Sequence, residues 1–300
     1  MAASQGAPAQ SLLLRAEAEM TGDRRWQSLH RLLRHRGAVI GFVLLLVMIV
    51  AALTAPLLTG YDPIQINPPV RNQAPSGEHW FGTDQFGRDI FTRVVYGARI
   101  SLPVGFIAVG IAAVVGLALG LVAGYYGKLL DAGIMRVIDV MLAFPGILLA
   151  LVVVAILGPS LVNVMIAVGI SEIPRYTRLV RGSVLSAKEN LYVDAARVTG
   201  VKDLAILARH ILPNVIGPIV VLATLSLGTA ILAAAGLSFL GLGAQPPNPE
   251  WGAMLADGRQ SLGSQWWIST MPGLAIAITV LAVNMAGDGL RDVLDPRLRV

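Results

Sequence analysis

Long runs of apolar residues constrain this chain more than any other feature of its sequence. The first run, "AVIGFVLLLVMIVAALTAPLL", can cross a bilayer, which needs about 20 apolar residues per helix. Inside a bilayer every backbone N–H and C=O must be satisfied within the segment, so such runs fold as helices. Together with this first run the sequence contains six candidate spans, at about 38–58, 101–125, 134–157, 161–182, 213–236 and 270–290. The sequence therefore predicts an all-α, polytopic membrane protein with six transmembrane helices.

The composition agrees with a membrane protein. The mean hydropathy is +0.69, 55% of the residues are hydrophobic and only 14% are charged. In soluble domains roughly a quarter of residues are charged, so water would not solvate the surface of this chain. Cysteine is absent, which excludes disulfides, thiolate metal sites and cysteine nucleophiles.

Lysine and arginine are distributed unevenly between the two sides of the predicted membrane. If the N-terminus is cytoplasmic, 18 of the 23 fall inside, and the five outside are Arg71, Arg88, Arg93, Arg99 and Arg259. This split follows the positive-inside bias, so both termini and the charged segment 183–212 are predicted to be cytoplasmic. A count of five spans would place the charged segment and the C-terminus on opposite sides of the membrane. We therefore keep the weakest candidate span, 161–182, although Glu172 and Pro174 interrupt it.

The spans divide the chain into four parts. Residues 1–37 form a cytoplasmic tail ending in "RRWQSLHRLLRHR", an amphipathic pattern typical of helices that lie on the lipid headgroups. The first span, 38–58, leads to an outside segment, 59–100. The remainder, 101–300, is a five-helix core with a second long outside loop at 237–269. Because the basic residues flank membrane spans, we predict no nucleic-acid binding.

The segment "DAARVTGVKDLAILARHILPN" (194–214) is polar although apolar spans lie on both sides of it. Just before it, Ser186 and Glu189 match a Ser-x-x-Glu capping box, which predicts a helix start. Leu191, Ala195 and Val198 then share one helical face.

Gly200 is predicted to end this helix, because glycine enters the left-handed conformation without strain. A second short helix should place Leu204, Leu207 and Ile211 on one side, and Pro213 should end it or open the next span. The small side chains of Ala195 and Ala196 would let the backbone of a partner approach closely. From the residues alone, an ordinary amphipathic loop is an equally good reading.

At these residues the sequence resembles the signature of ABC importer permeases, which is Glu-Ala-Ala, three residues, Gly, nine residues, Ile-x-Leu-Pro. The corresponding residues here are Asp194, Ala195, Ala196, Gly200, Leu212 and Pro213. Aspartate replaces glutamate at 194, and His210 stands in place of isoleucine. "RHILPN" is itself similar to the peptide-importer branch. The blocks 79–102, 238–255 and 287–299 also resemble segments of that branch, so the resemblance covers most of the chain.

The resemblance implies a type I ABC importer transmembrane domain in the bacterial cytoplasmic (inner) membrane. The chain looks like a C-type permease, most similar to the dipeptide and glutathione members. Such a permease pairs with a homologous B-type permease and receives substrate from an extracytoplasmic solute-binding protein. In this family the corresponding loop, 183–212 here, forms a coupling helix that sits in a groove of a cytoplasmic ATPase, and two such ATPases serve the paired permeases. Dipeptides, glutathione, longer peptides and nickel chelates are all compatible substrates.

The chain carries no phosphate-binding motif of its own. Its only Gly-Lys pair is Gly127-Lys128, where Val122 replaces the first glycine of a P-loop and Leu129 replaces the Ser or Thr. We therefore expect no cofactor in this chain and no enzymatic activity, with ATP and Mg²⁺ bound by the partner ATPases. An intramembrane protease using Asp139 and Asp288 is disfavoured, because arginines lie near both. An ion-coupled secondary transporter is the stronger alternative.

Glu172 lies well inside the fourth candidate span. A carboxylate at that depth suggests a function, so Glu172 is a candidate for the substrate pathway, where it would neutralise the ammonium end of a peptide. Two other interpretations remain open. It can pair with Arg175 or Arg178 one turn or more away, or the helix can end nearby so that the carboxylate reaches water.

Overall fold

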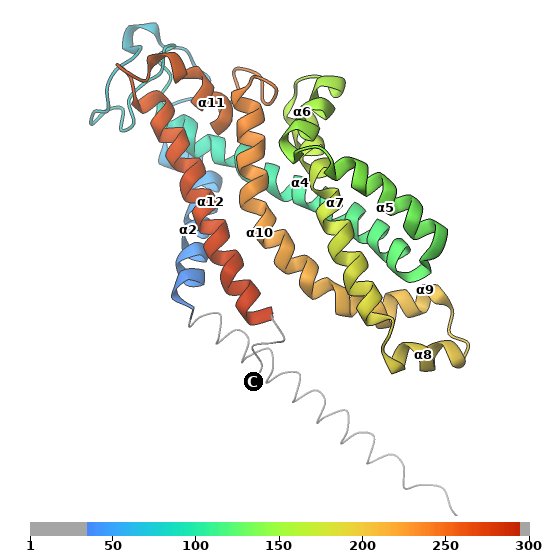
Figure 1. Cartoon of the computed structure of the whole chain (residues 1–300). Coiled ribbons are helices and arrows are strands. Elements are labelled where there is room, and N and C mark those ends of the chain that lie inside the picture. The colour runs from blue at the N-terminus through green and yellow to red at the C-terminus, as the bar shows by residue number, and fades with distance from the viewer. Residues whose placement is uncertain (1–34, 295–300) are drawn as a thin grey trace, which may run out of the picture.

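A computed structural model describes residues 35–294 of the chain (Figure 1). Within that range the structure is helical and has no strand beyond an isolated bridge between Thr83 and Asp89, as the all-α prediction requires. The helices are α2 (Arg36–Leu53), α3 (Ala55–Leu58), η1 (Pro68–Val70), α4 (Ile90–Tyr126), α5 (Lys128–Leu142), α6 (Gly146–Leu157), α7 (Leu161–Ala187), α8 (Leu191–Val198), α9 (Asp203–Ile206), η2 (Leu207–Ile211), α10 (Leu212–Phe239), α11 (Trp251–Asp257), η3 (Arg259–Ser261) and α12 (Trp267–Leu294).

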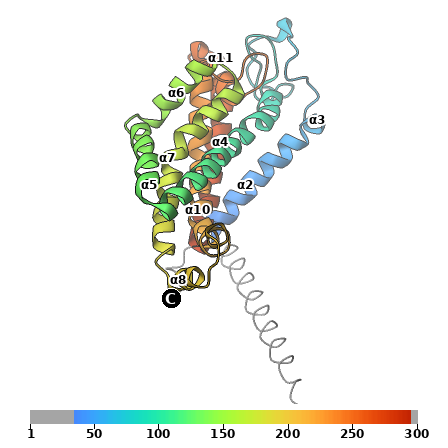
Figure 2. The same cartoon turned by 90° about the vertical axis from the view of Figure 1, so that its right-hand side faces the viewer.

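The long helices form one bundle with distinct ends. α7 packs along α4, α10 crosses both, α12 and α2 lie together, and α5 with α6 covers the outer side of α7 (Figures 1 and 2). α11 and the segment before α4 occupy one end of the bundle. α8 and α9 occupy the other end, where α2 begins and α12 ends. The described part of the chain thus enters and leaves the bundle at the α8 end.

The close packing of α4 against α7 depends on a stripe of glycines. Gly116, Gly120 and Gly124 recur every four residues on α4, so they lie on one face. A Cβ at Gly120 would lie 2.5 Å from Val180 Cβ and 2.8 Å from the Thr177 carbonyl oxygen. The other two glycines meet α7 equally closely. Small residues at this spacing let two membrane helices approach until their backbones nearly touch.

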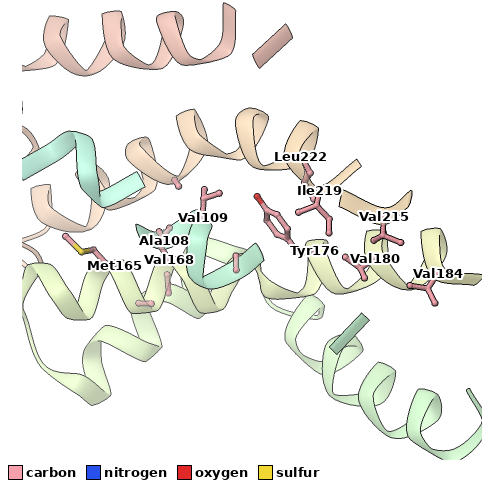
Figure 3. Packing of buried hydrophobic residues seen from close by; sticks show 14 of the residues in the cluster. Ala108, Val109, Met165, Val168, Tyr176, Val180, Val184, Val215, Ile219 and Leu222 are labelled. Atoms are coloured by element: carbon pink, nitrogen blue, oxygen red, sulfur yellow. The ribbon is translucent and has the colours of Figure 1, made fainter. Parts of the chain in front are cut away.

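The buried core lies where α4, α7 and α10 meet (Figure 3). Tyr176 of α7 is fully buried there, with Ile219 and Leu222 of α10 close by. Val180 and Val184 continue the same face of α7 toward α8. One face of α7 is therefore committed to packing inside this chain.

The structure does not confirm the predicted number of six membrane spans. Four helical segments are long and apolar enough to cross a bilayer: α2, α4, the continuous stretch from α9 to α10, and α12. The predicted span 161–182 lies within α7 and is helical, but α7 carries Glu172 and three arginines that lower its hydropathy. Arg181 and Arg178 form ion pairs with Asp131 (2.5 Å) and Asp139 (2.6 Å) of α5. Six crossings therefore remain a prediction.

The prediction of a single helix over 134–157 was wrong. This region forms α5 and α6, which meet at an angle of 94° and count as at most one broken span. Pro145 lies at the break and is followed directly by Gly146, the first residue of α6. Proline has no N–H to donate and disfavours the helical conformation of Phe144 before it, so α5 ends there.

The helix predicted from residue 101 instead begins at Ile90. Asp89 caps it, because its carboxylate accepts a hydrogen bond from Thr92 N at 2.7 Å. Arg93 and Arg99 lie in the added turns and donate to carbonyl oxygens of Pro63 (2.7 Å) and Leu53 (2.9 Å). Their charges hid this part of the helix from a search for apolar runs.

The two predicted outside segments, 59–100 and 237–269, pack against each other at the end opposite α8. The Trp267 indole donates to the Thr83 carbonyl at 3.1 Å, and Arg88 bridges Asp84 (2.6 Å) and Asp257 (3.5 Å). Burial raises the pKa of the Asp257 carboxyl above its usual value, while the Arg88 and Arg93 guanidinium groups oppose that rise. The loops therefore form one cap.

Candidate functional site

The segment between α7 and α10 projects from the bundle as two short helices. The predicted capping box is not formed, because α7 continues through Ser186 to Ala187. Asn190 marks the boundary instead: its side-chain amide donates to the Ala187 carbonyl at 2.9 Å, and α8 begins at the next residue. The helix start predicted at Ser186 is therefore wrong by about one turn.

The glycine corner predicted at Gly200 is confirmed. Gly200 has φ of +79°, a left-handed value that other residues rarely adopt. Its N–H donates to the Arg197 carbonyl at 3.0 Å, and Val201 N donates to the Ala196 carbonyl at 3.1 Å. This is the Schellman pattern, which satisfies the last carbonyls of a helix while the chain turns away.

α8 has one face against the bundle and one face in the open. Val193 and Ala196 are buried, so Ala196 packs within this chain and is unavailable for the close partner contact predicted for it. Leu191 and Val198 are 86% and 89% exposed, and Ala195 between them is also exposed. The structure therefore confirms that Leu191, Ala195 and Val198 share one face of α8. This face is an exposed apolar patch, which no other residue among 35–294 covers.

The second part of the segment differs from the prediction. Leu204 is 78% exposed whereas Ile211 is fully buried, so the two do not share a side. The cause is η2, a π-helical turn between α9 and α10. Its extra residue rotates α9, and with it Leu204, about the helix axis relative to α10. Leu212 and Pro213 form the first turn of α10, which follows η2 without a break, so Pro213 does not end the helix and lies inside one continuous helical stretch.

Three contacts fasten this segment to the α8 end of α4. The Tyr125 hydroxyl donates to Asp203 at 2.6 Å, and the Lys188 ammonium donates to the Gly124 carbonyl at 2.9 Å. The Arg197 guanidinium lies 5.5 Å from the centre of the Tyr125 ring. The sequence prediction missed Tyr125 and Lys188, since neither belongs to a motif. The segment that contains α8 and α9 is therefore tied to the end of α4.

The structure separates the predicted site residues into two groups. Asp194, Ala195, Ala196 and Gly200 lie together on α8 and its corner, with Leu212 and Pro213 at the start of α10. Asp194 is exposed and pairs loosely with Arg197 at 3.4 Å. Glu172 lies apart from them, near the middle of α7.

Glu172 has a partly buried side chain, and its Oε2 atom has no hydrogen-bond partner among residues 35–294. Neither alternative pairing is formed: within residues 35–294 Glu172 makes no ion pair with Arg175 or Arg178, and Arg178 binds Asp139 instead. α7 also continues 15 residues past Glu172, so the carboxylate does not lie at a helix end. The structure also disfavours an intramembrane protease, which would need Asp139 and Asp288 side by side. Asp139 is on α5 and Asp288 is on α12, on opposite sides of the bundle (Figure 1).

Comparison with known proteins gives the class. The family model described as "Binding-protein-dependent transport system inner membrane component" matches residues 116–300. The chain belongs to this family, and it is a permease component of an ABC importer, a multi-pass protein of the inner membrane.

A second model, "N-terminal TM domain of oligopeptide transport permease C", matches residues 25–75 and identifies the chain as a C-type permease. The dipeptide transport system permease protein DppC of Alkalihalophilus pseudofirmus is 52% identical over 284 residues, covering 94% of this chain and 93% of that protein. The glutathione transport system permease protein GsiD of Pectobacterium atrosepticum is 48% identical over 270 residues, covering 90% of each.

Among solved structures, one of the MetNI methionine ABC transporter in an inward-facing conformation is similar, with a TM-score of 0.54. It covers 69% of this chain and 98% of that chain at 19% identity. This likeness supports the type I importer fold and no more.

Proposed function

We propose that this chain imports short peptides, of the dipeptide or glutathione type, as one of two permeases in an ATP-driven importer. The names of relatives that are 44% to 52% identical over nearly the whole chain support this substrate class. The homologous B-type permease would complete the pathway. A solute-binding protein would deliver the peptide to the cap formed by 59–100 and 237–269. Both termini and α8 would then face the cytoplasm.

The exposed apolar patch of Leu191, Ala195 and Val198 is the observation that carries this proposal. A soluble ATPase that covers the patch would remove it from water, which favours association. Closure of two ATPases on ATP would displace α8, and Tyr125 and Lys188 would pass the displacement to α4. The pathway would then open alternately to each side, with ATP supplying the difference in binding free energy between the two states. ATP and Mg²⁺ would bind only to the ATPases.

The test is purification of the tagged chain in mild detergent, followed by reconstitution of the purified complex in liposomes. A second permease and P-loop ATPases should copurify, and the complex with its binding protein should import a labelled dipeptide only when ATP is present. A chain that purifies alone and moves solute down a proton or sodium gradient would instead be a secondary transporter.

Replacing Gly200 with valine should uncouple ATP hydrolysis from import while the spans remain inserted. A Cβ at this position meets no atom within 4 Å, so the only penalty is the left-handed backbone, about 1–2 kcal/mol or more for a β-branched residue. We expect import per ATP hydrolysed to fall severalfold. Gly200→Asn is the matched control, because asparagine tolerates this conformation. Normal import by the valine variant would remove the corner from the mechanism.

A further inference from the structure

A small pocket lies at the edge of the cap, beside the end of α3 and the first turn of α4. Its volume is about 180 Å³, and its lining includes three aromatic rings, Tyr61, Trp80 and Phe91, and three polar side chains, Glu78, Asp89 and Thr92. Sites that enclose a whole small ligand usually measure about 300–1,000 Å³, so this pocket fits a single small group. No lysine or arginine among residues 35–294 lines it.

The polar side chains of the pocket offer acceptors of hydrogen bonds. Asp89 is 4% exposed and firmly held, because its Oδ1 accepts from Thr92 N at 2.7 Å and its Oδ2 lies 2.9 Å from His79 Nδ1. Thr92 is 0% exposed, and its Oγ1 has no hydrogen-bond partner among residues 35–294. Glu78 is exposed. Buried polar atoms are nearly always satisfied, so an unpaired Oγ1 in the same pocket as two carboxylates points to a polar ligand.

The aromatic rings of the pocket favour a cation. The rings of Trp80 and Phe91 pack with their centres 4.9 Å apart. The Tyr61 hydroxyl donates to the Glu78 carbonyl oxygen at 3.3 Å. Burial, and then the negative charges of Glu78 and Asp89, raise the pKa of Tyr61 above its usual value. The face of an aromatic ring attracts a cation, and here two carboxylates add to that attraction.

The acceptors select one kind of cation. A primary ammonium donates three hydrogen bonds and accepts none, and the pocket offers it Glu78, Asp89 and Thr92 Oγ1. A quaternary ammonium has no N–H, so it would leave Thr92 Oγ1 unsatisfied. The chemistry of the pocket therefore fits a primary ammonium.

The surroundings of the pocket indicate where this ammonium comes from. Leu58, the last residue of α3, lines the pocket. Leu46, Val50 and Leu53 share one face of α2, which leads to α3 (Figure 2), and with Leu57 of α3 they are 48% to 87% exposed. Tyrosine and tryptophan are enriched where the bilayer meets water. We infer that the pocket binds the ammonium of a phospholipid headgroup, as in phosphatidylethanolamine, with its acyl chains along α2.

The test is native mass spectrometry of the tagged full-length chain in mild detergent, titrated with phosphatidylethanolamine or with phosphatidylcholine of the same acyl chains. Both headgroups carry a phosphate and a positively charged nitrogen, but only the ethanolamine nitrogen donates hydrogen bonds. Phosphatidylethanolamine should bind at least about tenfold more tightly, because hydrogen bonds to charged groups are lost with the choline headgroup.

Substitutions in the pocket separate its two contributions. Glu78→Gln removes an exposed charge and Thr92→Val removes the unpaired hydroxyl, and each should lower the preference for phosphatidylethanolamine severalfold. The double variant should bind the two lipids within about twofold of each other. Trp80→Leu removes a ring that is 62% exposed and should weaken both lipids, because its face attracts either cation. Trp266→Leu is the control: Trp266 is 49% exposed in the same cap but does not line the pocket, so this variant should keep the full preference.

Three results would overturn the lipid site. The unchanged chain could bind the two lipids equally, or the double variant of Glu78 and Thr92 could keep the preference, which would place the lipid elsewhere. Displacement of phosphatidylethanolamine by a dipeptide would assign the pocket to the ammonium of a peptide instead. None of these results bears on peptide import, so the proposed function stands or fails separately.

Discussion

Replacing Gly120 with leucine is expected to prevent the chain from folding stably in the membrane. A Cβ at this position would lie 2.5 Å from Val180 Cβ and 2.8 Å from the Thr177 carbonyl oxygen, and real Cβ atoms do not approach so closely. Leucine adds three more carbon atoms, so α4 and α7 must separate along their main interface. Overpacking of this kind costs about 3 kcal/mol or more.

The measurement is thermal stability of the tagged chain in mild detergent, followed by size-exclusion chromatography after heating. We expect the Gly120→Leu variant to run as aggregate, or to lose its monodisperse peak at a much lower temperature than the unchanged chain. Gly110→Leu is the matched control on the same helix, because a Cβ at Gly110 meets nothing within 4 Å. Equal stability of the two variants would contradict the packing of α4 on α7.

The sequence predicted helices wherever hydrophobicity alone decides the structure. The apolar runs correctly located α2, α10 and α12 and the apolar part of α4. The glycines at 116, 120 and 124 are visible in the sequence too, but their spacing does not say which helix they meet. That partner is α7, whose arginines make it the least apolar of the long helices.

The sequence failed where a distant contact decides the outcome. Arg93 is compatible with burial because distant groups surround its guanidinium: the Pro63 and Pro247 carbonyls accept its hydrogen bonds, and Asp84 lies 3.8 Å away. The break between α5 and α6 was a different case: Pro145 and Gly146 were visible, and hydrophobicity outweighed them in the prediction.

The candidate site shows the same division. Gly200 was predictable because a left-handed corner needs glycine whatever surrounds it. The burial of Ala196 and the π-helical turn before α10 were not, because both depend on how α8 and α9 lie against the bundle. Tyr125 belongs to no motif, and only the fold reveals that it holds Asp203.

Exchanging both Leu191 and Val198 for aspartate is expected to detach the ATPases from the permease. These side chains are 86% and 89% exposed in the chain alone, so their substitution removes no internal packing. Burying each against a partner contributes about 1.5–3 kcal/mol, and two buried aspartates would add a desolvation penalty. The dissociation constant should therefore rise more than about a hundredfold.

The measurement is the amount of ATPase that copurifies with the tagged permease, together with dipeptide import after reconstitution. Both should be lost while the thermal stability of the permease alone is unchanged, because Val193, Ala196 and the Gly200 corner still hold α8 in place. Leu262→Asp is the control for copurification alone, and it should keep its ATPases: Leu262 is also exposed and apolar, but it lies at the opposite end of the bundle, in the cap proposed to receive the peptide. If the double variant kept its ATPases and imported peptide normally, α8 would not be the docking surface, and the exposed patch would need another partner.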